Sequence, residues 1–197
     1  MSRGCGIVYS FFKIGDVRMY QGKNRTALAS QRQLADAMVV LMHRMPYTEI
    51  SVAELCREAS VSRQTFYSLF QNKSNVIRYL LRESCDPYVP EREPDVSHLR
   101  QMCRYYALYI TGHREIMSLL VDNGMTAMIS DMLLRAFQKD GLFGHALLEE
   151  QRKYHALFLA GGLTRLAKTF IKENTEAKDI EEIVYLLMYG SHKAFDQ

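Results

Sequence analysis

The chain has 197 residues, a net charge of +3 and 48% hydrophobic residues, enough for one large or two small folded units. Alternating apolar and polar runs are scarce and only 4 prolines occur, so an all-α protein is expected. No apolar run reaches the roughly 18 residues that a bilayer-spanning helix needs. The four cysteines (Cys5, Cys56, Cys85 and Cys103) lack C-x-x-C spacing, which argues against a zinc site or a disulfide framework and suits a reduced cytoplasm.

Charge is distributed unevenly along the chain. Residues 1–82 carry 12 Lys/Arg against 5 Asp/Glu, a net +7, whereas residues 83–197 carry 13 against 17, a net −4. A basic first part and an acidic second part are typical of a protein whose first part alone contacts nucleic acid.

Residues 1–24 are compositionally unlike the rest. The apolar run at 7–12 is too short and too weakly flanked for a signal peptide. Two explanations remain open: a genuine N-terminal extension, or a start codon placed too early. We favour the second, with Met19 as the natural first residue. In either case Lys23 and Arg25 are placed to reach a phosphate or the minor groove, as basic arms do.

Three helices are predicted next, at about residues 27–45, 52–59 and 63–70. Pro46 ends the first, and Ser51 with Glu54 forms a capping box at the start of the second. Ser62 can cap the third. On this third helix the inward face is Phe66, Leu69 and Phe70, and the outward set is Arg63, Gln64, Thr65, Tyr67 and Ser68. Two short helices joined by a tight turn, with base- and phosphate-binding groups outside, predict a DNA-reading helix-turn-helix; two ordinary core helices are the alternative.

The segment resembles the DNA-binding domain of the TetR family of bacterial repressors, over about residues 27–82. The residues that carry the resemblance are Tyr47, Ser51-Val52, Ala59-Ser60-Val61-Ser62, Thr65-Phe66-Tyr67, Phe70 and Lys73. One position departs from the family, because its turn glycine is Ser60 here. If that residue needs φ > 0, serine costs roughly 1 kcal/mol more than glycine.

This resemblance implies roles for individual residues. Arg63, Gln64 and Thr65 would face base edges, and Ser51, Tyr67 and Lys73 would hold phosphates together with Lys23 and Arg25. Lys73 also stands at the start of a predicted fourth helix, where backbone N–H groups attract an anion.

Three of the four prolines fall within residues 86–97 and mark a connector. The predicted parts are therefore an extension or mis-started tail (1–24), a helix-turn-helix DNA-binding domain (25–85) and a helical effector-binding and dimerisation domain (86–197). Beyond the connector, helical spacing continues at about 99–113, 116–120, 125–136, 146–172 and 178–194.

Methionine, tyrosine and histidine recur on the stripes of this second part. They are either ordinary core or the lining of a pocket for an irregular apolar ligand, because methionine adapts to shape and tyrosine hydroxyls anchor polar groups. The candidate effector-binding residues are Met102, Tyr106, Tyr109, His113, Met117, Met128, Met132, His155 and Phe158.

The last two helices are apolar on more than one face, which suggests a partner subunit. Gly161-Gly162 lies within the first of them, either where a second helix approaches closely or at a break between two shorter helices. In the TetR family these two helices form the intersubunit bundle, and the predicted interface residues are Leu157, Gly161, Gly162, Thr164, Ile183 and Leu187.

Motifs for nucleophilic, phosphate-binding or metal chemistry do not occur, so no catalytic, metal or cofactor residue is predicted and we expect a protein that is not an enzyme. The predicted function is a cytoplasmic homodimeric regulator that binds a pseudo-palindromic duplex, a repressor released by an unknown small-molecule effector, with no membrane partner. The alternative is a DNA-bound protein that recruits a protein partner and takes no small-molecule effector.

Overall fold

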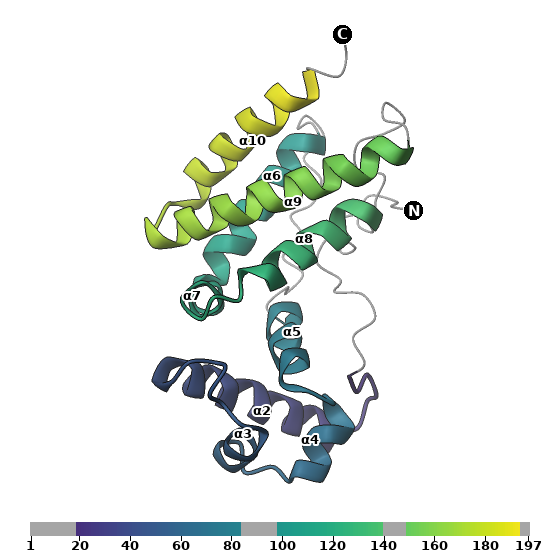
Figure 1. Cartoon of the computed structure of the whole chain (residues 1–197), viewed down its shortest axis with the longest axis vertical. Helices are drawn as coiled ribbons and strands as arrows, with labels where there is room; N and C mark the ends of the chain where they lie inside the picture. Colours follow the sequence, from purple (N-terminus) through teal and green to yellow (C-terminus); the bar gives the residue numbers. More distant parts are fainter. Residues whose placement is uncertain (1–18, 84–97, 140–148, 194–197) are drawn as a thin grey trace. The chain divides into compact units, whose positions relative to one another are not determined.

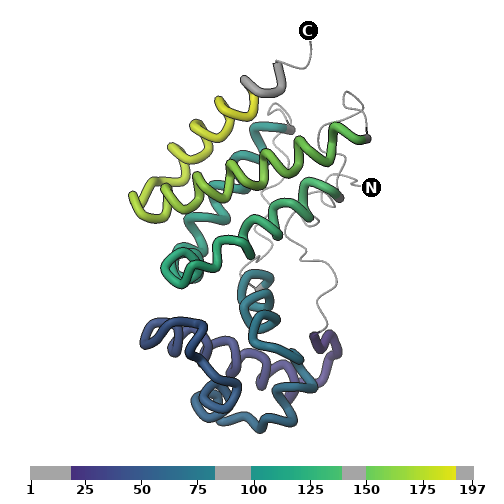
Figure 2. Tube along the Cα trace, in the orientation of Figure 1, coloured from purple at the N-terminus to yellow at the C-terminus, as the bar shows by residue number. Residues whose placement is uncertain are grey.

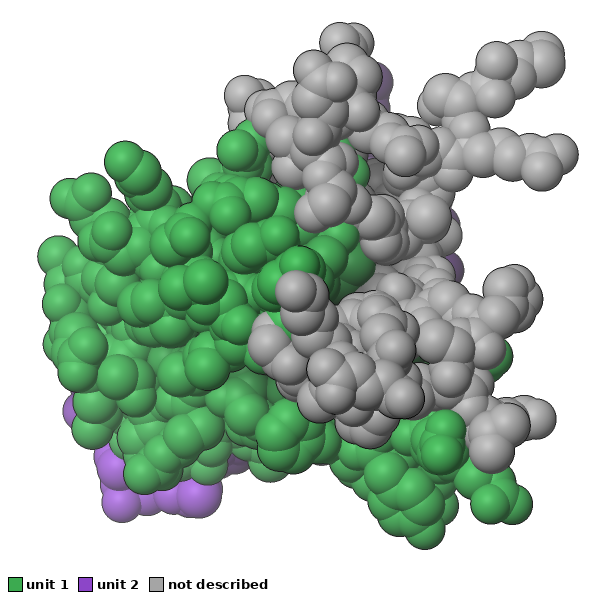
Figure 3. Space-filling view, turned by 90° about the horizontal axis from the view of Figure 1, so that it is seen from above, with its two compact units in different colours: residues 1–13, 85–197 green, residues 14–84 purple. Residues whose placement is uncertain are grey.

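The computed structural model describes residues 19–83, 98–139 and 149–193, and every regular element in these ranges is an α-helix (Figure 1). The all-α prediction is therefore confirmed for the described residues, whose trace is drawn in Figure 2. The described residues form two compact units, one within Ile14–Ser84 and the other within Cys85–Gln197 (Figure 3). The predicted tail up to residue 18 and the proline-bearing connector lie outside the described residues.

The first unit contains α2 (Arg25–Arg44), α3 (Val52–Glu58), α4 (Arg63–Leu69) and α5 (Lys73–Glu83). Helix α2 packs against the other three, and the side chains of Leu34, Met38, Leu55, Phe66, Phe70 and Ile77 are fully buried at their centre. The first helix begins earlier than its apolar spacing predicts. Its N-cap is Asn24, whose side-chain oxygen accepts hydrogen bonds from the backbone of Thr26 and Ala27.

The turn between α3 and α4 requires a left-handed residue. Ser60 has φ = 52°, its N–H bonds the carbonyl of Arg57, and the N–H of Val61 bonds the carbonyl of Cys56. These two bonds satisfy carbonyls that the end of α3 would otherwise leave without donors. Ser60 therefore adopts a left-handed backbone conformation that glycine would adopt with less strain.

The second unit contains α6 (His98–Gly112), α7 (Arg114–Asp122), α8 (Thr126–Lys139), α9 (Glu149–Lys172) and α10 (Ala177–Lys193). Helix α10 packs along α6, α9 packs along α8, and α7 contacts both α6 and α9 (Figure 1). The end of α9 resembles that of α3, with Asn174 at φ = 54°. The guanidinium of Arg114 donates to the carbonyls of Phe170 (3.3 Å) and Thr175 (2.6 Å), which ties α7 to the end of α9.

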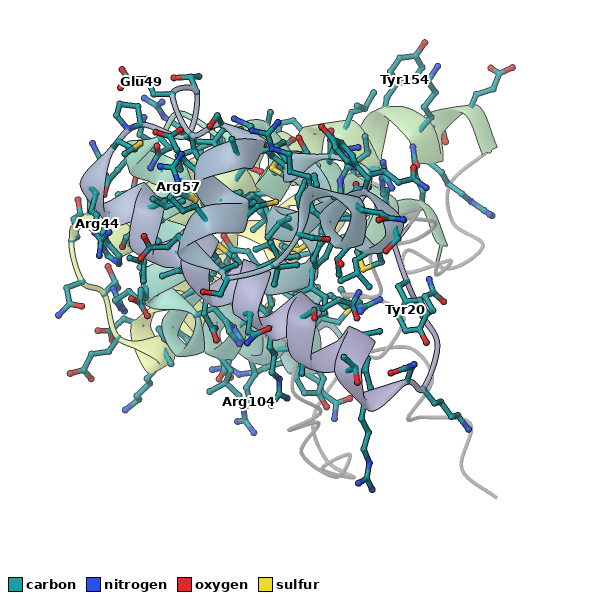
Figure 4. The ribbon with its side chains drawn as sticks, turned by 90° about the horizontal axis from the view of Figure 1, so that it is seen from below. Tyr20, Arg44, Glu49, Arg57, Arg104 and Tyr154 are labelled. Atoms are coloured by element: carbon teal, nitrogen blue, oxygen red, sulfur yellow. The ribbon has the colours of Figure 1, made fainter. Side chains whose placement is uncertain are left out.

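Charged pairs join α6 to α10 across the same unit. Arg104, labelled in Figure 4, lies 3.1 Å from the Glu181 carboxylate. Arg100 pairs with Glu181 and Glu182 and lies over the ring of Tyr185, 4.5 Å from its centroid. These side chains stay partly exposed, so the pairs orient the two helices more than they stabilise them.

Candidate nucleic-acid interface

Helix α3 begins with the predicted capping box. The Ser51 hydroxyl accepts the N–H of Glu54 at 3.1 Å, and the Glu54 carboxylate accepts the N–H of Ser51 at 2.9 Å and its hydroxyl at 2.7 Å. These bonds from Ser51 hold the pKa of Glu54 below its usual value. The hydroxyl that was predicted to hold a phosphate is thus already used within the cap, although Ser51 itself is exposed.

Helix α4 presents a polar outer face because two apolar side chains fix its inner face. Phe66 and Leu69 are 0% and 3% exposed. Arg63 and Gln64, predicted to contact bases, are both exposed in the first turn of the helix. Tyr67 is 53% exposed and its ring meets that of Phe66 edge-on, with centroids 5.2 Å apart.

Thr65 is less available than its two neighbours. Its hydroxyl lies 2.8 Å from that of Ser62, whose oxygen also accepts the Thr65 N–H at 3.0 Å, and the residue is half-buried. Of the three predicted base-contacting residues, the structure therefore leaves Arg63 and Gln64 on the surface and uses Thr65 in the N-terminal cap of α4.

The predicted phosphate contact of Lys73 is at odds with the position of its ammonium group. The Nζ atom donates to the carbonyl oxygen of Tyr47 at 3.1 Å and to that of Ile50, and it lies 4.6 Å from the centroid of the Tyr47 ring. Partial burial lowers the pKa of Lys73, an effect that the Glu54 carboxylate opposes. The ammonium group therefore lies against backbone carbonyls of its own unit and is not directed toward solvent alone.

The segment before α2 is tied to α4. The Tyr20 N–H bonds the carbonyl of Leu69 at 2.9 Å, the Tyr20 carbonyl accepts the side-chain amide of Gln31 at 3.0 Å, and the Asn24 N–H bonds the Tyr20 hydroxyl at 3.2 Å. Met19 is buried (9% exposed). Packing of the first unit thus begins before residue 25, where the sequence analysis places the domain boundary; Tyr20 is labelled in Figure 4.

Lys23 and Arg25 follow this anchored segment and are exposed at the start of α2. Sequence reasoning did not identify the anchor, although the signal exists in Gln31, a polar residue on the apolar stripe of α2 that is 0% exposed. A buried amide needs a partner, and the backbone of Tyr20 supplies one.

Most predicted effector-binding residues belong to the core of the second unit. The buried members, between 0% and 5% exposed, are Met102, Tyr106, Tyr109, Met117 and Met132. Hydrogen bonds hold two of them: the Tyr106 hydroxyl donates to the carbonyl of Leu163 at 2.6 Å, and the Tyr109 hydroxyl lies 3.5 Å from the Met132 sulfur. Burial raises the pKa of Tyr106 well above its usual value.

The other members of that set lie closer to solvent. His113, Met128 and His155 are half-buried, and the His113 ring nitrogen Nδ1 lies 2.7 Å from the Tyr109 carbonyl. Phe158 is 70% exposed, so the structure places it on the outside of α9 and not with the buried methionines and tyrosines.

Large apolar side chains are exposed on both of the last two helices, and this set of residues is called the α9/α10 face below. Its predicted members are Leu157 (45% exposed), Ile183 (40%) and Leu187 (55%), with Gly161 and Gly162 also exposed. Sequence reasoning missed Tyr154, Leu186 and Tyr189, and it placed Phe158 elsewhere. Tyr154, labelled in Figure 4, is 68% exposed and points away from α9.

Thr164 does not belong to this face. It is 8% exposed, and its hydroxyl donates to the carbonyl of Ala160 within α9 at 2.6 Å. Tyr154, Phe158 and Gly161 follow one another at helical spacing, and Thr164 falls at the edge of their stripe. Because its hydroxyl is hydrogen-bonded within α9, the Thr164 side chain can be buried without an unsatisfied polar atom.

Within residues 19–83, 98–139 and 149–193, no three histidine, cysteine, aspartate or glutamate side chains are grouped so as to hold a metal ion. Among the same residues, no helix combines the length and apolar character that crossing a membrane requires.

Comparison with known proteins relates the chain to a transcriptional activator. No family model matches the chain. Over 56 residues it is 32% identical to the HTH-type dhaKLM operon transcriptional activator DhaS of Lactococcus lactis, a match that spans 28% of this chain and only 30% of that relative. A solved structure, the dihydroxyacetone kinase operon activator DhaS, aligns with a TM-score of 0.54 and 16% identity over 84% of this chain and 97% of that one. The chain therefore shares the all-helical fold of that activator.

Proposed function

We propose that this chain is a homodimeric transcription regulator that reads double-stranded DNA with α4. The observation that carries the proposal is the pair of exposed side chains of Arg63 and Gln64 in the first turn of α4, which Phe66 and Leu69 fix to the core. In helix-turn-helix proteins the first residues of the second helix contact base edges. The resemblance to the TetR family and the similarity to a helix-turn-helix activator support the same reading.

Arg63 and Gln64 match the chemistry of base edges. An arginine pairs with the two acceptors of guanine, and a glutamine pairs with the donor and acceptor of adenine. The exposed side chains of Lys23, Arg25 and Tyr67 are the proposed phosphate contacts. The net charge of +7 on residues 1–82 supports a polyanionic partner for this part of the chain.

Dimerisation supplies the second reading helix. The α9/α10 face combines several large apolar side chains that a monomer would leave in water, and a second copy of this chain would cover them. Two copies related by a two-fold axis would read half-sites centred about 34–36 Å apart on a pseudo-palindrome.

The proposal includes an effector in the second unit and no enzymatic activity. In the TetR-like version the protein is a repressor, and a small molecule among the methionine and tyrosine side chains of α6, α7 and α8 lowers its affinity for DNA. The sign of regulation is open to a direct test, because the named relative is an activator. A reporter gene placed behind the bound sequence gives that sign.

A second candidate function is recruitment of a protein partner to DNA without a small-molecule effector. The observation that favours it is the burial of Met102, Tyr106 and Met117, each at most 5% exposed, combined with the exposure of large apolar side chains on α9 and α10. In this version the partner occupies part of the α9/α10 face.

The central test is selection of DNA from a random-sequence pool by the full chain. The proposal predicts enrichment of one pseudo-palindrome, and Gln64→Ala should relax the preference at one base position in each half-site, at a cost of roughly 1–3 kcal/mol there. Enrichment of no sequence by the unaltered protein would refute the proposal. If Gln64→Ala keeps the base preference of the unaltered protein at every position, Gln64 does not contact a base and other residues read the sequence.

A further inference from the structure

The first turn of α5 satisfies backbone carbonyls on both sides of the helix-turn-helix. On the side of α3, the Lys73 ammonium group donates to the carbonyls of Tyr47 and Ile50. On the side of α4, the buried side-chain amide of Asn75 donates to the carbonyl of Phe70 at 2.6 Å. One turn of one helix therefore holds the entrance to α3 and the exit from α4.

The carbonyls that Lys73 binds belong to the turn that leads into α3. Within this turn the N–H of Ile50 bonds the carbonyl of Tyr47 at 3.3 Å, and Ser51, the N-cap of α3, follows directly. The hydroxyls of Tyr47 and Ser74 lie 3.2 Å apart and give α5 a second attachment to the turn. Contacts from Lys73 and Ser74 of α5 thus fix the position of the N-terminus of α3.

Contact between this ammonium group and a DNA phosphate would break several interactions together. Nζ would leave two carbonyl acceptors and the face of the Tyr47 ring, and the carbonyls would lose their charged donor. Hydrogen bonds from a charged donor are stronger than neutral ones, and weakening or removing the donors of partly buried acceptors is costly. The Tyr47 carbonyl would keep the longer bond from the Ile50 N–H. Lys23 and Arg25 are exposed and reach a phosphate without such losses.

We propose that Lys73 is a positioning residue, which fixes the turn before α3 to α5 so that α3 and α4 meet the duplex in one orientation, and which does not itself neutralise a phosphate. This inference rests on the proposed DNA-binding function and deepens it. It assigns to Lys73 a role different from the one that the family resemblance implies.

Salt dependence of DNA binding separates the roles. Full-length Lys73→Met and, as a matched control, Lys23→Met are compared with the unaltered protein on the selected duplex and on a mixed-sequence duplex, at a temperature where circular dichroism shows all three folded. Each lost phosphate contact reduces the slope of log affinity against log salt by about 0.9. We expect Lys73→Met to bind both duplexes roughly tenfold more weakly with an unchanged slope, and Lys23→Met to reduce the slope.

Two results would overturn the inference. A slope reduced by about 0.9 in Lys73→Met would make Lys73 a phosphate ligand, and unchanged affinity in the folded variant would make it a purely local stabiliser. If the unaltered protein binds neither duplex, the proposed function fails, and the positioning role fails with it.

A measurement on the unaltered protein covers the case in which Lys73→Met does not fold. Lysine side chains are acylated in the free protein and in the presence of the mixed-sequence duplex, and the modified sites are mapped by mass spectrometry. DNA should slow the acylation of Lys23 and leave the rate at Lys73 unchanged. Protection of the Lys73 amine by DNA to the same degree as Lys23 would contradict the positioning role.

Discussion

The hydroxyl of Tyr106 on α6 donates a hydrogen bond to the carbonyl oxygen of Leu163 on α9, at 2.6 Å. Tyr106 is 2% exposed and Leu163 is 5% exposed, so water does not compete for this bond. The ring of Tyr106 was predicted to line an effector pocket, and its polar atom instead joins two core helices. A substitution that removes only that oxygen measures what the bond contributes.

Tyr106→Phe should destabilise the folded protein by about 1–2 kcal/mol, because the Leu163 carbonyl loses its cross-helix donor in a buried site. Urea unfolding followed by circular dichroism measures this difference. Tyr67→Phe is the matched control: its hydroxyl belongs to a side chain 53% exposed in the first unit, so stability should change little while DNA affinity falls. Equal stability of Tyr106→Phe and the unaltered protein would show that the bond contributes nothing net.

Ser60 offers a test of backbone strain. Its φ of 52° lies in the left-handed region, where a side chain costs about 1 kcal/mol relative to glycine. Ser60→Gly should therefore raise stability by up to about 1 kcal/mol, reduced by the greater freedom that glycine gives the unfolded chain. Ser60→Val should lower it, because a branched side chain fits this conformation worst. The thermal unfolding midpoint should therefore be highest for Ser60→Gly and lowest for Ser60→Val. A midpoint raised by valine would contradict a strained turn.

Cys103 predicts a loss of stability at alkaline pH. Burial, followed by the charge of nearby Glu181, raises the pKa of this thiol to about 12. The folded protein then keeps a proton that the unfolded chain releases near pH 8.5. The resulting stabilisation is complete below that pH and is lost as the pH rises toward the folded-state value, with a slope of roughly 1.4 kcal/mol per pH unit.

Unfolding by urea at several pH values above about 8.5 measures this slope. Cys103→Ala should reduce the slope. The part that remains comes from Cys56, whose pKa burial also raises, and above pH 10 or so from the Tyr106 hydroxyl, whose pKa burial raises as well. Equal pH dependence in Cys103→Ala and the unaltered protein would show that the thiol is not the group responsible.

Local signals made the helix-turn-helix predictable. Capping by Ser51 and Ser62 depends on residues three positions apart, and the apolar spacing of Phe66 and Leu69 depends on a single helix. The inward position of Lys73 was not predictable in this way, because its acceptors belong to residues 23 and 26 positions earlier in the chain. Helical position and charge alone favour a phosphate contact.

The same limit explains the errors on α9. An exposed and a buried aromatic look alike in sequence, and only the packing of α9 on α8 shows which side of the helix faces inward. Phe158 therefore belongs with Tyr154 on the outer stripe, while Thr164 lies at its edge and is buried. The outer stripe can be recovered from the spacing of residues 154, 158 and 161 once one of them is known to be exposed.

The glycine pair of α9 gives the sharpest test of the dimer. A Cβ atom at Gly161 or at Gly162 would meet nothing within 4 Å apart from the adjoining residues and the backbone of its own helix turn. Gly162→Leu should therefore leave the isolated fold intact and even favour the helix, since leucine has a helix propensity about 0.8 kcal/mol better than glycine. If a partner helix lies against this position, the new side chain meets it, and sedimentation at micromolar concentration should show a shift from dimer to monomer. Gly162→Ala should produce a smaller shift.

If Gly162→Leu forms dimers as tight as those of the unaltered protein, the interface lies away from the glycine pair. If the unaltered protein itself is a monomer, the proposed dimer is wrong.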